Sequence, residues 1–353
     1  METVDIQVTR TKRSRLHEMD FNHLPFGKYF SDHMLEADYA DGEWQTVSIK
    51  PYQPISFEPS LMALHYGQSI FEGIKAYRNK AGEAFIYRPY DNLRRFNISA
   101  DRMEMPAVPE EIFIEGMRRL IAIDKDWIPA KEEYSLYIRP FMFATDAALG
   151  VKPSDTYKFM ILLSPTGPYY AAPMKIYVEE KYTRAAPGGV GFAKNAGNYG
   201  GSLKAASEAK ARGYDQVLWT DAFEHKWLQE VGTMNVFFVF GNKAVTPSLE
   251  EGTILEGVTR DSVIQVLREQ GILVEERKIH IDELVEGHRS GKLTEIFGSG
   301  TAATISPLKE LRYKDYSMHF DVSAFTVAPL AKRILTEIRE GKRPDIHSWL
   351  VKV

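Results

Sequence analysis

The chain has 353 residues and a formal net charge of −4, from 44 lysines and arginines against 48 aspartates and glutamates. This length suits one large core or two ordinary domains, because single hydrophobic cores stop growing near about 250–300 residues. The absence of cysteine excludes disulfides and thiol catalysis. The nine histidines never stand at metal-ligand spacing. The weak acidity and the lack of a run of about 18 apolar residues argue against nucleic-acid and membrane partners.

A cluster of four basic residues near the N-terminus has the charge of a targeting peptide: Arg10, Lys12, Arg13 and Arg15. Transit peptides avoid acidic residues, however, and Glu2 and Asp5 precede this cluster. No apolar segment follows it. We therefore expect a solvated segment before the first element, in a cytoplasmic protein.

The first part of the chain mixes short strands with helices. The spacing of apolar residues predicts strands at 85–87, 134–143 and 159–163 and a helix at 109–123. The segment 164–173 holds three prolines and a glycine, which block both a helix and a central strand. These features predict an N-terminal small domain at 1–163, an interdomain loop at 164–174 and a C-terminal domain at 175–353.

The second part contains more strands, which the sequence predicts at 174–178, 217–219, 236–240, 273–274 and 295–297. Gly241-Asn242 is a two-residue turn into a partner strand at 243–245. A helix is predicted at 260–270, with Gly271 just past its end. Strands and helices do not alternate strictly, which favours two domains of the α+β class.

Lys194 lies in a glycine-rich segment, 188–200, among small residues and away from carboxylates. A lysine nucleophile needs such surroundings, because an ammonium without a strong anionic partner loses its proton more readily. Glycines also let the backbone close around a planar ligand. The alternative is an ordinary surface lysine, as we expect for Lys204 with Glu208 four residues further on.

Glu230 stands just before an apolar strand. A carboxylate so close to a buried strand is costly unless a cation compensates it, and a protonated pyridine nitrogen is one such cation. The alternative is an acid on an edge strand that faces water.

Two further segments suit an anion. Residues 255–260 open the predicted helix, whose N-terminal N–H groups and dipole attract anions, although Thr259 could equally be an ordinary cap. Residues 297–303 are small or carry hydroxyls, so that main-chain N–H groups can approach an anion. They are not a Walker loop, and a plain turn is the alternative. The amine of Lys194, the carboxylate of Glu230 and these two anion-binding segments are together the groups that a pyridoxal phosphate enzyme requires.

The chain also resembles the branched-chain amino-acid aminotransferases, of the fold-type-IV pyridoxal phosphate class, from about residue 21 onward. The resemblance rests on separate blocks in the expected order, at 26–34, 64–77, 135–140, 194–200, 230–235, 257–260 and 298–302. It implies a two-domain α+β fold with a smaller N-terminal α/β domain and a larger C-terminal domain. It also implies pyridoxal 5'-phosphate as the cofactor and a homodimer.

For the cofactor, the resemblance implies that Lys194 forms a Schiff base and moves the α-proton as base and acid. Glu230 is implied to hold the pyridine nitrogen, and Tyr199 the ring phenolate. Arg88 is implied to hold the phosphate, which suits a bidentate guanidinium; without the resemblance it would pass for a surface arginine. The phosphate site is completed by backbone N–H groups of Val258 and Thr259 and by the hydroxyl of Thr301.

For the substrate, the resemblance implies that backbone N–H groups of Thr301 and Ala302 receive the α-carboxylate and that Thr233 also binds substrate. Arg139 is implied to meet the γ-carboxylate of glutamate, a structural salt bridge being the alternative. The segment 167–170 is expected to close over the site. Four aromatic residues are implied to line the side-chain pocket, although such residues often simply fill a core: Phe26, Tyr66, Phe71 and Tyr137.

The leading interpretation is amino transfer between leucine, isoleucine or valine and 2-oxoglutarate, in a biosynthetic enzyme of bacterial type. Mammalian relatives carry a redox-active cysteine pair where this chain has 303–306, so thiol control is excluded. A D-amino-acid transaminase or an aminodeoxychorismate lyase of the same fold is an alternative, with different polar groups in the side-chain pocket. A non-catalytic binder is another, and it would lack Lys194 or Glu230.

Overall fold

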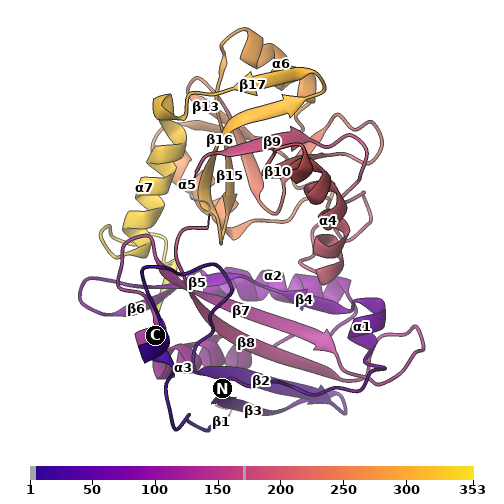
Figure 1. Ribbon diagram of the computed structural model, residues 1–353, viewed down its shortest axis with the longest axis vertical. Helices are drawn as coiled ribbons and strands as arrows, with labels where there is room; N and C mark the ends of the chain where they lie inside the picture. The colour runs from indigo at the N-terminus through magenta and orange to yellow at the C-terminus, as the bar shows by residue number, and fades with distance from the viewer. Residues whose placement is uncertain (1–4, 170–171) are drawn as a thin grey trace. The chain divides into compact units, whose positions relative to one another are not determined.

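The computed structural model describes residues 5–169 and 172–353, which fall into two compact units (Figure 1). Unit 1 comprises Met1–Tyr169, Ala193–Ala196 and Glu337–Val353, and unit 2 comprises Tyr170–Phe192 and Gly197–Thr336. The division after residue 169 lies inside the proposed loop 164–174, of which 170 and 171 are outside the described residues. Unit 1 is the larger unit, whereas the sequence predicts a smaller N-terminal domain. The difference arises because the last residues of the chain return to unit 1.

Unit 1 is built on one mixed sheet with the strand order β1-β3-β2-β8-β7-β5-β6-β18, and β4 pairs with β7 beside this path. Its strands are β1 (Ile6–Val8), β2 (His33–Ala40), β3 (Glu43–Pro51), β4 (Ser69–Phe71), β5 (Ile74–Arg78), β6 (Ala84–Tyr87), β7 (Ser135–Ala144), β8 (Tyr157–Thr166) and β18 (Leu350–Lys352). Its helices are η1 (Leu16–Glu18), α1 (Met62–Tyr66), α2 (Pro89–Arg102), the π-helical η2 (Glu111–Glu115), α3 (Gly116–Ile123) and η3 (Lys125–Trp127).

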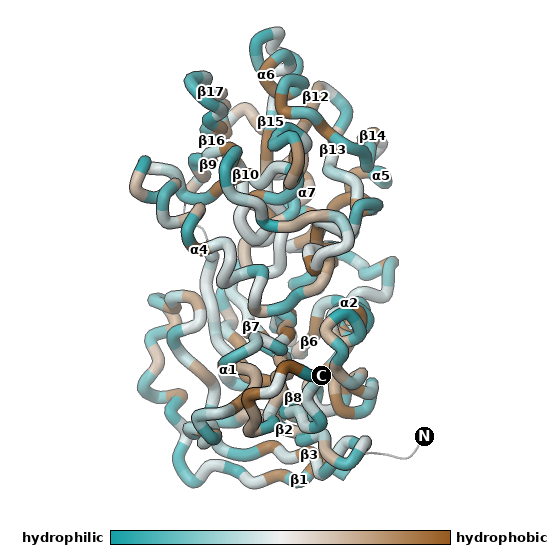
Figure 2. The backbone as a smooth tube through the Cα atoms, turned by 90° about the vertical axis from the view of Figure 1, so that its right-hand side faces the viewer, coloured by the Kyte–Doolittle hydropathy of each residue, from teal (hydrophilic) through white to brown (hydrophobic). Residues whose placement is uncertain are grey.

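The core of unit 1 lies where α2, η2 and α3 cover one face of this sheet. Figure 2 shows the strands β7, β8, β2, β3 and β1 in the same order as Figure 1, with α2 to one side. Phe96 of α2 packs edge-on against Phe159 of β8, with ring centroids 5.6 Å apart. Side chains alternate along a strand, and Leu136 and Ile138 of β7 belong to this core. Tyr137 and Arg139 therefore lie on the opposite face.

The segment 164–173 differs from its prediction, because β8 continues through Pro165 to Thr166. Pro165 pairs with Leu136 of β7. On the other side of β8, the register with β2 ends at Ile161. The carbonyl of Leu163 still accepts the N–H of Ser31. Pro165 lies beyond this last bond, and a proline without an N–H is tolerated at such an edge.

Unit 2 is built on a second mixed sheet, with the strand order β11-β10-β9-β16-β15-β12-β13-β14 and with β17 beside β16. Its strands are β9 (Met174–Val178), β10 (Gln216–Thr220), β11 (Leu228–Val231), β12 (Asn235–Phe240), β13 (Lys243–Thr246), β14 (Leu273–Glu276), β15 (Leu293–Gly300), β16 (Thr304–Tyr313) and β17 (Tyr316–His319). Its helices are α4 (Ala196–Ala211), α5 (Val258–Glu269), α6 (Ile281–Arg289), η4 (Val322–Ala324) and α7 (Val327–Arg339); α4 starts and α7 ends with residues of unit 1.

The elements predicted from apolar spacing are confirmed, with ends that shift by a few residues. The helix predicted at 260–270 is α5, and Gly271 beyond it has a φ of +73°, which a glycine adopts without strain. The expected hairpin joins β12 to β13. The predicted helix at 109–123 begins as η2 and continues as α3. No helix among residues 5–169 and 172–353 is long and apolar enough to cross a membrane.

Candidate functional site

Lys194 stands in the short segment Ala193–Ala196, which belongs to unit 1 although the chain on both sides of it belongs to unit 2. Its backbone carbonyl accepts a hydrogen bond from the N–H of Phe71 in β4, at 3.0 Å. Its backbone N–H donates to the hydroxyl of Ser99 in α2, at 2.9 Å. The Nζ atom lies 4.9 Å from the centroid of the Phe71 ring. The predicted nucleophile is therefore a half-buried lysine over an aromatic face, not a solvated surface lysine.

Four of the predicted substrate residues form one continuous cluster with Lys194. The guanidinium carbon of Arg139 lies 4.7 Å from the ring centroid of Phe71, and an Arg139 N–H donates to the Tyr137 hydroxyl at 3.0 Å. Phe26 packs edge-on against Tyr137, with centroids 4.8 Å apart. A Cβ at Gly73 would lie 2.2 Å from the Tyr137 hydroxyl oxygen, so the glycine there makes room for this phenol.

The charge of Arg139 has no acidic partner among the residues that the structure describes. Within residues 5–169 and 172–353, no carboxylate pairs with its guanidinium, and its buried Nε atom has no hydrogen-bond partner. The structural salt bridge considered for Arg139 is therefore absent from the described residues. The neighbouring Arg95 shows the contrast, because both of its bonds to Glu72 measure 2.8 Å and both side chains are buried.

Arg88, the predicted phosphate ligand, is buried, so it is not the surface arginine that its neighbours suggest. It is the N-cap residue of α2 and has a left-handed backbone, with φ 49° and ψ 49°. Its guanidinium bonds Asp91 at 2.8 Å and lies 5.1 Å from the Trp349 ring centroid. Its N–H donates to the Trp349 carbonyl at 2.7 Å. The side chain is held by an acid and a ring on two sides.

Tyr66 lies on α1 and is exposed, and its hydroxyl donates to the carbonyl of Leu149. Both are among six exposed apolar residues that lie on α1, on the segment before it or on the segment after β7, and we call these six the α1 patch: Ile55, Phe57, Leu64, Tyr66, Leu149 and Val151. Leu64 is 72% and Val151 85% exposed. Tyr66 is thus part of this surface, while Phe26, Phe71 and Tyr137 contact one another or Arg139 and form the cluster around Lys194.

In unit 2, Glu230 of β11 is buried, so the interpretation as an acid facing water does not hold. Its Oε1 accepts hydrogen bonds from the N–H of Leu255 at 2.7 Å and from the Asn235 amide at 3.4 Å. Its Oε2 lies 3.0 Å from a guanidinium nitrogen of Arg184, whose side chain is also buried. The cation that compensates Glu230 within this unit is Arg184. These donors fix the orientation of the carboxylate before any ligand binds.

Val258 and Thr259 are buried in the first turn of α5. The N-cap residue is Gly257, which has no side-chain oxygen to bond the first N–H groups. The Asn235 side chain lies so close to Gly257 that a Cβ on residue 257 would be 1.9 Å from the Oδ1 atom of Asn235. The same Asn235 side chain donates to Glu230 and to the carbonyl of Leu255. It therefore ties the helix start to the buried acid.

The remaining predicted residues of unit 2 lie at element ends. Tyr199 is half-buried in the first turns of α4, and Thr233 is exposed in the turn between β11 and β12. Thr301 and Ala302 are half-buried in the turn between β15 and β16. Much of the glycine-rich stretch before them is strand and not loop, because Ser299 pairs with Asn235 and with Ile305. The predicted loop 167–170 reaches residue 170, outside the described residues.

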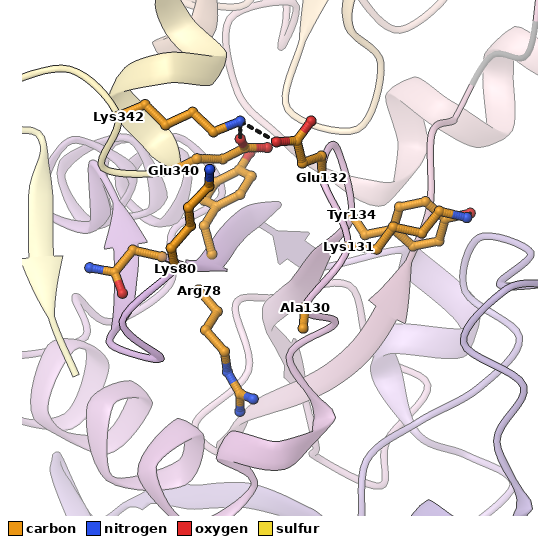
Figure 3. Close-up of a pocket in the computed structure, with 10 residues that line it drawn as sticks. Arg78, Lys80, Ala130, Lys131, Glu132, Tyr134, Glu340 and Lys342 are labelled. Atoms are coloured by element: carbon orange, nitrogen blue, oxygen red, sulfur yellow. Dashed lines mark hydrogen bonds and ion pairs between the residues drawn. The ribbon is translucent and has the colours of Figure 1, made fainter.

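A small cavity of about 110 Å³ in unit 1 is lined by none of the predicted site residues (Figure 3). Beside it, Lys342 bridges the carboxylates of Glu132 and Glu340. Their hydrogen bonds and charges raise the pKa of Lys342 well above its ordinary value. These charges already compensate one another, so the cavity carries no sign of a reaction site.

Three residues that surround the predicted site were missed by sequence reasoning. Ser99 bonds the backbone of Lys194, Arg184 pairs with Glu230, and Leu255 donates to the same acid. Each contact joins segments far apart in the chain, so no local spacing signals it. Asn235 stood in a matching block but gave no hint of its role, because its contacts depend on where α5 begins.

Comparison with known proteins gives the family of the chain. The model of the class IV amino-transferases matches residues 69–311. The chain therefore belongs to the class IV aminotransferases, which are enzymes. It is 50% identical to a protein of Staphylococcus aureus (strain N315) named "Probable branched-chain-amino-acid aminotransferase", over 94% of this chain and 93% of that protein.

Solved structures give the same result. The branched-chain amino acid aminotransferase of Escherichia coli superimposes with a TM-score of 0.75 at 26% identity, covering 90% of this chain and 98% of that one. The "T.th." branched-chain amino acid aminotransferase complexed with N-(5'-phosphopyridoxyl)-L-glutamate gives 0.72 at 27% identity, covering 89% and 97%. Within its class, the chain belongs to the branched-chain-amino-acid aminotransferases. The predicted fold-type-IV fold is confirmed.

Proposed function

We propose that the chain transfers the amino group between L-leucine, L-isoleucine or L-valine and 2-oxoglutarate, with pyridoxal 5'-phosphate as the cofactor. The observation that carries this proposal is the pair of cations over Phe71, Lys194 at 4.9 Å and Arg139 at 4.7 Å. It sets the predicted reactive amine beside an aromatic wall and beside a guanidinium that no described carboxylate neutralises. Such a group of side chains suits substrates with either an apolar side chain or a second carboxylate.

The donors of the two units fit the chemistry of pyridoxal phosphate. In unit 1, the guanidinium of Arg88 suits a phosphate. In unit 2, the first N–H groups of α5 follow a glycine that cannot cap them with a side chain, which also suits an anion. Glu230, buried and oriented by three donors, suits a protonated ring nitrogen. When bound, the cofactor supplies an aldehyde that bonds amines and a ring that withdraws electrons.

The roles of the protein groups follow from their chemistry. With the cofactor bound, the Nζ of Lys194 would take the proton from the α-carbon of the amino acid and would deliver it to the former aldehyde carbon of the cofactor. Glu230 keeps the ring nitrogen charged, and Tyr199 donates to the ring oxygen. Backbone N–H groups of Thr301 and Ala302 hold the α-carboxylate, with Thr233 beside them among the substrate-binding residues. The N–H groups of Val258 and Thr259 and the hydroxyl of Thr301 complete the phosphate site.

The side-chain pocket accepts two kinds of substrate in this proposal. Phe26, Phe71 and Tyr137 contact branched aliphatic side chains and keep water away from them. Arg139 meets the γ-carboxylate of glutamate in the same place, because its guanidinium already lies over Phe71. Segment 167–170 is proposed to cover this pocket, and Phe26 contacts the ring of Tyr169 at 4.9 Å.

Borohydride reduction of the purified protein tests the proposal. The full chain is expected to be yellow, and reduction followed by peptide mapping should place the cofactor on Lys194. Lys194→Ala should lose at least about 10⁴-fold in turnover, because the covalent link and the proton carrier disappear together. Lys204→Ala is the matched control, since Lys204 is exposed and pairs with Glu208 at 3.1 Å. A colourless protein, or cofactor fixed elsewhere, contradicts the proposal.

We also propose that a second copy of the chain covers the α1 patch, so that the enzyme is a homodimer. Exposed apolar side chains that lie together mark association surfaces, and α1 with the segments before it and after β7 carries six exposed apolar residues. The patch includes Tyr66, whose predicted substrate role is explained if it serves the second copy.

Analytical ultracentrifugation tests the dimer. Leu64→Asp puts a charge in the centre of the α1 patch and should shift the protein to single chains. Leu273→Asp, at a leucine 58% exposed on β14, is the control and should leave the dimer intact. Wild-type protein that sediments as a single chain overturns the proposal.

The biosynthetic direction and a cytoplasmic location are proposed as well, on the resemblance alone. Rates for the keto acids of leucine, isoleucine and valine, with glutamate as donor, test the direction. A rate far below that of the reverse reaction at matched concentrations argues against it.

A further inference from the structure

Ser99 of α2 is fully buried and uses both hydrogen-bonding capacities of its hydroxyl. The hydroxyl donates to the carbonyl of Arg95, one turn earlier, at 3.0 Å. The same oxygen accepts the backbone N–H of Lys194 at 2.9 Å. A serine hydroxyl offers one donor and two lone pairs, so this side chain can serve the helix and the lysine together.

These two bonds are part of a hydrogen-bond network that begins and ends at Lys194. Arg95, whose carbonyl receives the Ser99 proton, holds Glu72 through two bonds of 2.8 Å. Glu72 follows Phe71 in the chain, and the N–H of Phe71 donates to the carbonyl of Lys194. The network thus reaches Lys194 at its N–H through Ser99 and at its carbonyl through Phe71. Both polar backbone groups of the lysine are bonded to unit 1.

We propose that Ser99 is a positioning residue that fixes the backbone of Lys194 and so aims its amine. This inference rests on the proposed role of Lys194. Segment 193–196 lies between two stretches of chain that belong to unit 2, so chain connectivity alone does not hold it on unit 1. Hydrogen bonds hold it there: β4 supplies the bond to the Lys194 carbonyl and pairs with Asn195 through Ile70, whereas Ser99 supplies the bond to the Lys194 N–H. Without the Ser99 oxygen, the N–H side loses its anchor and the Cα of Lys194 is free to tilt.

Amide hydrogen exchange on the full chain measures this anchor directly. In the wild type, the Lys194 amide should exchange slowly, because its partner is fully buried. In Ser99→Ala it should exchange about tenfold to hundredfold faster, the usual cost of removing the partner of a buried donor. Ser99→Thr retains the oxygen and should preserve the slow exchange. Ser31→Ala is the control, since Ser31 is equally buried and its hydroxyl donates to the His33 carbonyl, away from Lys194.

Steady-state kinetics give the second readout. A tilted lysine should lower kcat about tenfold to hundredfold in Ser99→Ala while changing KM for leucine by only about twofold, because proton transfer is sensitive to geometry and substrate binding is not affected. Ser99→Thr should recover most of kcat. A merely structural role would lower the melting temperature in Ser99→Ala and Ser31→Ala alike, with no split between kcat and KM.

The outcomes separate the two proposals. Fast exchange of the Lys194 amide in the wild type, or unchanged exchange in a folded Ser99→Ala, overturns the positioning role. If Ser99→Ala does not fold, the wild-type exchange rate and the Ser99→Thr variant still decide it. Borohydride fixation at a different lysine overturns the proposed function instead, and the exchange data remain valid.

Discussion

The two units hold their charged site residues in opposite ways. In unit 1, the guanidinium of Arg139 contacts a phenol and two aromatic rings, and no carboxylate of the described residues neutralises it. In unit 2, Glu230 already has an arginine and two N–H donors around it. The acid is fixed before anything binds, while no acid of the described residues fixes the cation. A fixed acid suits one permanent partner, whereas an open cation suits substrates that change within each reaction cycle.

The largest effect is expected from Glu230→Ala, which removes the fixed carboxylate of unit 2. Turnover should fall on the order of 10²–10³-fold, because a preorganised charge at the ring nitrogen is lost. The free energy of unfolding should also fall by about 3–5 kcal/mol, since buried Arg184 loses its acid. Stopped-flow turnover and urea unfolding measure the two effects.

The double variant Arg184→Met/Glu230→Ala separates these two roles. It should regain much of the stability, because no buried charge remains unpaired, but none of the turnover. Near-normal turnover in Glu230→Ala contradicts the ring-nitrogen role, and unchanged stability contradicts the importance of the buried ion pair.

Arg139→Met tests the cation of unit 1, and its effect on the reaction should be smaller than that of Glu230→Ala. KM for glutamate should rise about tenfold to hundredfold, the usual value of a charge-assisted hydrogen bond, while KM for leucine stays nearly constant. Arg118→Met is the control, because Arg118 is exposed and pairs with Glu115. An equal rise for both substrates contradicts the assignment of Arg139 to the γ-carboxylate.

The smallest effect on the reaction is expected from Lys75→Met. This variant tests a buried cation of unit 1 through the free energy of unfolding. Burial, with the nearby charge of Arg339, lowers the pKa of Lys75 from 10.5 to about 7. Between pH 7 and 10.5 the unfolded chain therefore binds more protons at this residue than the folded chain does. The free energy of unfolding should rise with pH in this window, by up to about 1.4 kcal/mol per pH unit.

Urea unfolding at pH 7, 8 and 9 measures that slope. Lys75→Met should flatten it and should stabilise the protein most at pH 7. A slope that persists unchanged in the variant shows that Lys75 is not its source.

Much of the fold could be predicted from the sequence, because local spacing reflects local burial. The alternation in β7 and the periodicity of α5 are of this kind, and so is the glycine after α5. The continuation of β8 through Pro165 could not be predicted, since it depends on where β2 stops pairing.

The site could be predicted only in part. Lys194 and Glu230 stand out by their neighbours in the sequence, and their catalytic roles stay predictions. Arg184 and Ser99 do not stand out, because their importance lies in contacts between remote segments. Tyr66 was expected in the pocket wall, but its place on the α1 patch is decided by how α1 packs.

The backbone of Arg88 has a consequence for the order of events during synthesis. Its left-handed conformation costs about 1–3 kcal/mol, and its N–H is bonded by Trp349, beside strand β18. A nascent chain still lacking its last few residues lacks the carbonyl that accepts this N–H, although Asp91 can already bond the guanidinium. The start of α2 therefore gains this hydrogen bond only when the ribosome has made almost the whole polypeptide, and a chain that ends before residue 349 would never form it.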